Sequence, residues 1–150
     1  MAFYAPILES NFITIEGFDD LTPQQAFDMS AKHILSNGPS FDSKLNSCRY
    51  AGSGCAASVF LREEFRAIAD RKGGQWLAVV ATRLASITNI DLIMSLQNAH
   101  DDSVDAALDM DDTGVNKVVN LNNFSTRWVH AMREVAAKFN LNTEVLDTAK

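Results

Sequence analysis

The sequence predicts an α+β fold that is mostly α: a compact single domain of about five helices with one small β-hairpin near residues 47–60. Two observations support this prediction. Apolar residues recur at three- and four-residue steps over much of the chain, as they do along one face of an α-helix. Gly52 and Gly54 separate two short segments and permit the positive φ angles of a tight turn.

Length and composition indicate one ordinary folded domain. The chain has 150 residues, of which 47% are hydrophobic, so it can bury a sizeable core without disulfides or metals. We predict that residues 1–20 form an N-terminal extension or a short strand, and that residues 21–150 form a single globular domain.

The first predicted helix spans residues 22–37 and has the best-marked ends. Thr22 suits the N-cap position, Pro23 suits the first helical position, and Gln25 completes a capping box. Asn37-Gly38-Pro39 then predicts the end of the helix, with a left-handed cap followed by a residue that cannot continue it.

The predicted hairpin contains both cysteines. Arg49-Tyr50 and the segment 55–60 are its strands, and residues 51–54 are its turn. If Tyr50 pairs with Cys55, the two sulfurs lie diagonally on one face, roughly 7–8 Å apart. That separation suits a shared metal better than a disulfide. A slip of one residue would instead place Cys48 and Cys55 on opposite faces.

The second half of the chain reads as further helices around an acidic segment. The predicted helices cover residues 62–72, 76–87, 89–100 and 124–139. Thr88 is the expected N-cap of the third of these, and Asn140 the expected stop of the last. Between them, residues 101–121 are acidic and then mixed, and 115–121 reads as a strand or an extended loop.

Charge and hydropathy exclude several classes of partner. The net charge is -6 and the pI is about 4.9, which argues against direct binding to nucleic acid. No apolar run reaches the roughly 18 residues of a membrane span, and the N-terminus lacks the pattern of a signal peptide. We therefore expect a cytoplasmic protein whose cysteines are thiols. Nothing in the sequence predicts its oligomeric state.

Several short motifs follow one another in a fixed order. They are the segment 21–28, His33, Gly38, Cys48-Arg49-Tyr50, Cys55-Ala56, Leu96-Gln97-Asn98-Ala99-His100-Asp101, and Trp128 followed by the segment 133–141. This ordered set resembles a family of small proteins encoded by bacteriophages and bacterial genomes. The chain departs from the family pattern at Ala51-Gly52 and Gly54-Cys55-Ala56-Ala57-Ser58, and it is longer between His100 and Trp128. The resemblance implies a phage origin and life in the host cytoplasm, but no catalytic residue.

One set of residues has the chemistry of a metal or thiol site: Cys48, Cys55, His33 and His100. Zinc binds Cys and His in tetrahedral sites, and a Cys–His pair can act as a nucleophile. The two cysteines are six residues apart, wider than the usual zinc spacing, and the histidines come from separate helices. Buried thiols and hydrogen-bonded histidines are therefore the preferred interpretation, and we predict no metal and no other cofactor.

The segment Asp109–Gly114 begins like a calcium-binding loop. Such a loop needs a bidentate acid at its twelfth position, which is Asn120, and Lys117 occupies the ninth. We interpret the segment as an acidic, solvated loop.

The function predicted from the sequence is that of an interaction module, a small acidic phage-type protein that binds and modulates a host protein. The candidate binding residues are Arg49, Tyr50, Asp109, Asp111 and Asp112. Tyr and Arg are enriched among interface anchors, and acids at a rim accelerate association. The alternative is a small metal- or thiol-dependent enzyme built on the cysteine–histidine set. A weaker alternative is a nucleic-acid mimic.

Overall fold

The computed structural model describes residues 20–42, 54–61, 66–67, 70 and 88–148. These ranges contain three α-helices, α1 (Pro23–Asn37), α4 (Ile90–Ala106) and α5 (Leu121–Phe139). They also contain two short 3-10 helices, η2 (Ser58–Phe60) and η3 (Glu144–Thr148), and two strands, β1 (Leu108–Met110) and β2 (Lys117–Val119). The described part is thus mostly helical with a small antiparallel sheet, which agrees with the predicted α+β class, although the sheet lies outside the predicted residues 47–60. The predicted helix 76–87 lies outside it, and of the predicted helix 62–72 it includes Arg66, Ala67 and Asp70, which are helical.

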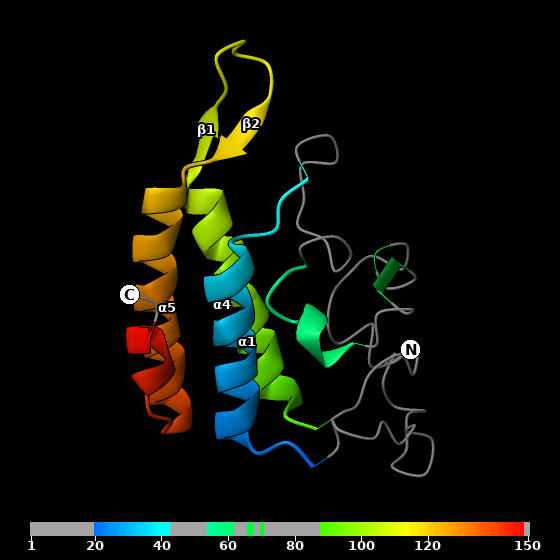
Figure 1. Cartoon of the computed structure of the whole chain (residues 1–150), viewed down its shortest axis with the longest axis vertical. Helices are drawn as coiled ribbons and strands as arrows, with labels where there is room; N and C mark the ends of the chain where they lie inside the picture. The colour runs from blue at the N-terminus through cyan, green and yellow to red at the C-terminus, as the bar shows by residue number, and fades with distance from the viewer. Residues whose placement is uncertain (1–19, 43–53, 62–65, 68–69, 71–87, 149–150) are drawn as a thin grey trace, which may run out of the picture.

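The helices form a layered packing that positions the sheet at one end. Figure 1 shows α4 and α5 running antiparallel side by side, with α1 in front of α4. The strands join α4 to α5 as a hairpin that projects beyond the ends of both helices (Figure 1). Segment 54–61 packs against α1 and α4 from the other side, and η3 returns to contact α1.

Helix α1 confirms the prediction made from its caps. Thr22 Oγ1 accepts a hydrogen bond from the Gln25 amide at 3.1 Å, and Gln25 Oε1 accepts one from the Thr22 amide at 2.9 Å. The helix ends at Gly38, whose φ of 74° favours glycine. Its ψ of -173° is extended, so this cap is not the left-handed one that was predicted.

Helix α4 begins and ends elsewhere than predicted. Its N-cap is Asn89, not Thr88, and Asn89 adopts a left-handed backbone with φ of 60°, which asparagine tolerates. The Asn89 side chain donates to the Leu21 carbonyl at 2.8 Å instead of capping the helix. The helix continues to Ala106 because Ser103 and Val104 are buried against the rest of the core. The acidic residues Asp101, Asp102 and Asp105 are therefore helical.

The prediction of a hairpin at residues 47–60 is wrong for its second strand, residues 55–60. Residues 43–53 lie outside the described part of the chain, but Cys55–Phe60 form a turn and η2. The Ser58 amide bonds to the Cys55 carbonyl at 3.0 Å, and the Phe60 amide bonds to the Ala57 carbonyl at 3.1 Å, so this backbone is coiled.

The hairpin in the described ranges lies instead between α4 and α5, within the 101–121 segment. The register pairs Leu108 with Val119, Asp109 with Val118 and Met110 with Lys117. We call Leu108–Val119 the β1–β2 hairpin. It includes part of the segment 115–121, for which a strand was one of two predicted conformations.

Helix α5 contributes the aromatic residues Phe124 and Trp128 to the core. Phe124, Trp128, Met132 and Val135 are buried along one stripe, as its periodicity predicts. Asn140 ends the helix with φ of 57°, which confirms the predicted stop. Among the described residues, no helix is both long enough and apolar enough to cross a membrane.

Candidate functional site

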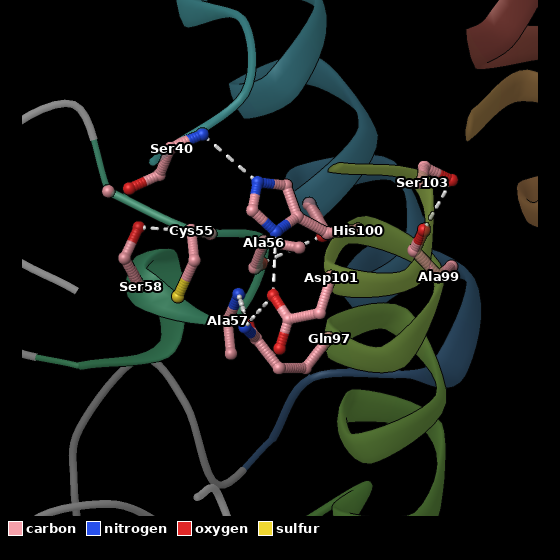
Figure 2. Close-up of polar contacts among 12 residues, drawn as sticks. Ser40, Cys55, Ala56, Ala57, Ser58, Gln97, Ala99, His100, Asp101 and Ser103 are labelled. Carbon is pink, nitrogen blue, oxygen red and sulfur yellow. Dashed lines mark hydrogen bonds and ion pairs between the residues drawn. The ribbon is translucent and has the colours of Figure 1, made fainter. Parts of the chain in front are cut away.

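Gln97, His100 and Asp101 form a hydrogen-bonded network on one face of α4 (Figure 2). Asp101 Oδ1 accepts from Gln97 Nε2 at 2.8 Å and lies 2.9 Å from His100 Nδ1. His100 Nε2 accepts from the backbone amide of Ser40 at 3.0 Å. Since Nε2 is an acceptor, the ring proton must lie on Nδ1, where it is donated to the carboxylate. The imidazole is therefore neutral in this arrangement.

The network connects α4 to two segments that are distant in the sequence. Gln97 Oε1 accepts from the Ala57 amide at 3.0 Å, and His100 reaches Ser40 (Figure 2). His100 is fully buried and its ring packs edge-on against Phe124, with centroids 5.8 Å apart. A buried amide without an acceptor is costly, so these side chains stabilise the ordered backbone near residues 40 and 57.

His33, which lies on α1, contacts the turn formed by residues 54–58. Its Nε2 lies 3.0 Å from the Gly54 carbonyl and 3.3 Å from Ser58 Oγ. The carbonyl can only accept, so Nε2 carries the proton, and Nδ1 can accept from Asn37 Nδ2 at 3.2 Å. Both ring nitrogens of His33 and of His100 are thus engaged by protein groups.

Cys55 is a buried thiol in an environment that disfavours the thiolate form. The side chain is 1% exposed, and burial raises its pKa to about 12, although Ala57 and Gln97 oppose that shift. A thiol nucleophile needs a lowered pKa, so Cys55 does not have the properties of one. Cys48 lies outside the described residues. In the part of the chain that is described, no three His, Cys, Asp or Glu side chains form a group able to hold a metal ion.

These geometries explain the motif Leu-Gln-x-x-His-Asp as a structural one. Leu96 is fully buried, and Gln97, His100 and Asp101 make the network described above. His100 and Asp101 follow Gln97 by three and four residues, a spacing that places them on the same face of a helix as Gln97. This spacing can be read from the sequence. Ser30, whose Oγ donates to the Ala56 carbonyl at 2.8 Å, adds to the same contact and was not predicted.

The predicted acidic binding residues lie on the β1–β2 hairpin. Asp109 Oδ2 accepts from Asn120 Nδ2 at 3.2 Å. Asp111 accepts from the Thr113 hydroxyl and from the Thr113 and Asn116 amides, which closes the hairpin loop. The Thr113 hydroxyl makes the largest contribution to lowering the pKa of Asp111, which keeps this carboxylate ionised. Asp112 is exposed. The other candidates, Arg49 and Tyr50, lie outside the described residues.

The same hairpin carries apolar side chains that the sequence did not single out. In the described ranges, the large hydrophobic residues classed as exposed all fall between residues 110 and 121. They are Met110 at 52%, Val115 at 75%, Val118 at 42% and Leu121 at 65% exposed. Hydropathy alone cannot identify such residues, because it does not distinguish an exposed valine from a buried one.

A shallow depression of about 470 Å³ lies between α4 and α5. Its lining includes the charged or titratable residues Asp102, Arg127 and His130 and small residues such as Ala106. His130 is exposed and pairs with Glu134 at 2.8 Å, and the buried Ser103 hydroxyl donates to the Ala99 carbonyl. His130 and Ser103 of the depression are therefore already paired with groups of their own helices.

Comparisons of this chain with protein-family models, with curated proteins and with solved structures found no match. The resemblance to phage-encoded proteins thus stays a prediction based on the motifs given above.

Proposed function

We propose that this chain is a small, acidic, phage-type interaction module that binds and modulates a host protein. The observation that supports the proposal best is the clustering of exposed large hydrophobic residues on the β1–β2 hairpin and the first residue of α5. Apolar groups that remain in water in the free chain are a common feature of surfaces that become buried in a complex.

The arrangement of the polar groups supports binding over catalysis. The candidate catalytic residues His33, Cys55 and His100 are engaged or buried by the fold itself. A mimic of nucleic acid would present regularly spaced charge, whereas the acids of the β1–β2 hairpin are confined to residues 109–112 and share the hairpin with exposed apolar side chains.

The test is affinity capture from host extract with matched variants. The triple variant Met110→Ser/Val115→Ser/Val118→Ser should stay folded, because all three side chains are exposed, and should lose the captured protein. The control is Lys32→Ser/Glu134→Ser, which changes exposed residues on α1 and α5 and keeps the net charge. Equal capture by the wild type and the triple variant would contradict a binding role for the hairpin.

A further inference from the structure

The β1–β2 hairpin has exposed apolar side chains on both of its faces. Its register places Met110 on the same face as Leu108, Lys117 and Val119, and places Val118 with Asp109 on the opposite face. Leu108 and Val119 pack against the core at the base of the hairpin, whereas Met110 lies farther out and is 52% exposed. Val115 lies in the loop at the tip and is 75% exposed.

This distribution determines the shape of the surface that could cover the hairpin. A flat partner surface would bury one face and leave the apolar residues of the other in water. Since Met110, Val115 and Val118 lie on one face, at the tip and on the other face, burying all three requires a cleft that encloses the hairpin. The projection of the hairpin beyond the ends of α4 and α5 leaves room for such enclosure (Figure 1).

The charges on the hairpin determine the chemistry of the rim. The sequence between residues 108 and 121 contains Asp109, Asp111, Asp112 and one cation, Lys117. Placing a second copy of the hairpin against it would bring like charges together, which is unfavourable. An anionic membrane surface would repel it for the same reason. Lysine and arginine side chains would complement it.

We infer that the β1–β2 hairpin inserts into an apolar cleft of a partner protein whose rim is lined by lysine and arginine side chains. The inference rests on the proposed function and adds the class of surface to it. Apolar contacts in the cleft would set the lifetime of the complex, and the three carboxylates would set the rate of association.

The first experiment locates the contact. The photoreactive residue p-benzoylphenylalanine replaces Val115 in the full chain, and in a control it replaces the exposed Ala137 at the opposite end of α5. After irradiation in host extract, mass spectrometry identifies the cross-linked residue. Position 115 should give one protein, cross-linked at an apolar site flanked by Lys or Arg, and position 137 should not.

The second experiment separates charge from apolar contact with the purified pair. Asp109→Asn/Asp111→Asn/Asp112→Asn should slow association by about tenfold at low ionic strength and remove most of its salt dependence. A control with the same change in net charge, Asp91→Asn/Glu134→Gln/Glu144→Gln, should have a much smaller effect. Val115→Ser should leave association nearly unchanged and speed dissociation by about tenfold.

Several outcomes would overturn the inference and can be told apart. A cross-link to a second copy of the chain, or co-sedimentation with vesicles of phosphatidylcholine and phosphatidylglycerol that Val115→Ser abolishes, would assign the hairpin to another occupant. A protein cross-linked at an acidic or uncharged site would refute the basic rim while the proposed function stands. A partner cross-linked only from position 137 would refute the hairpin as the contact. If no host protein is captured at all, the proposed function fails with it.

Discussion

The buried histidine of the α4 network allows a sharp test of how this fold is held together. We consider His100→Phe, which keeps a planar ring against Phe124 and removes both ring nitrogens. The Ser40 amide then loses its acceptor at a site where Ser40 is 4% exposed. Such a loss costs about 1–3 kcal/mol. Loss of the contact between His100 and Asp101 adds little to this cost, because the Asp101 side chain is 40% exposed and water can replace the histidine.

The expected result is a destabilisation of about 1–3 kcal/mol, or a melting temperature lowered by roughly 3–10 °C for a chain of this size. Chemical denaturation measures the first quantity and calorimetry the second. Amide hydrogen exchange adds a local readout, since the Ser40 amide should lose protection while amides in the middle of α5, such as that of Met132, exchange only through global unfolding.

The matched control is His130→Phe. His130 is also paired with an acid, Glu134, but the two side chains are 78% and 69% exposed. An exposed pair contributes at most about 0.5 kcal/mol, so this variant should be nearly neutral. If the two variants have equal stabilities, or if His100→Phe equals the wild type, the network does not stabilise the fold and our reasoning is refuted.

Three further predictions concern the caps, the thiol and the hairpin loop. Thr22→Ala should lower the free energy of unfolding by about 1 kcal/mol through loss of the N-cap acceptor, as measured by urea denaturation. In a Cys48→Ser background, Cys55 should react with a disulfide reagent at pH 8 only after unfolding, because burial raises the pKa of its thiol to about 12. The Thr113 amide resonance should titrate with a midpoint below the ordinary aspartate value, because the pKa of Asp111 is lowered.

The signs of the two pH effects follow from the direction of each shift. Asp111 is stabilised as the carboxylate in the folded state, so its contribution is present at neutral pH and is lost as the pH falls through its folded pKa. The Cys55 thiol is stabilised as the neutral form, so stability falls as the pH rises from the ordinary value of 9.0 towards about 12. Rapid labelling of folded Cys55, or a Thr113 midpoint at the ordinary aspartate value, would contradict these assignments. An unchanged denaturation midpoint for Thr22→Ala would do so for the cap.

Elements whose ends depend on local chemistry could be predicted from the sequence. Thr22, Gln25 and Gly38 act within one or two turns of α1, so their effect can be read from neighbouring residues. The buried stripe of α5 could also be predicted from the sequence, because its apolar residues from Phe124 to Val135 recur at three- and four-residue steps.

Elements decided by distant contacts could not be predicted in this way. The glycine-rich segment before Cys55 suggested a strand pair, but the backbone at 55–60 is fixed by α1 and α4 through Ser30, His33 and Gln97. Strand β1 and its pairing with β2 were not predicted, because strands of three residues are too short to show an alternating pattern. The face of α4 that carries the network could be predicted from residue spacing. Its partners, Ala57 and Ser40, could not, because they lie 40 and 60 residues away in the sequence.

The site that we propose from the structure differs from the cysteine–histidine set considered from the sequence, and the reason is related. Cysteine and histidine attract attention because they can do chemistry, yet a group can act on a substrate only if the fold leaves it available. In the described part of the chain, the fold uses His33 and His100 to satisfy or to hold backbone groups and buries Cys55. The β1–β2 hairpin is the reverse case, because Met110, Val115 and Val118 remain exposed on it. Exposure of apolar side chains costs free energy in the free protein, and that cost is recovered when a partner covers them. Our proposal therefore rests on the apolar groups that the fold leaves exposed on the β1–β2 hairpin and not on the residues that are intrinsically reactive.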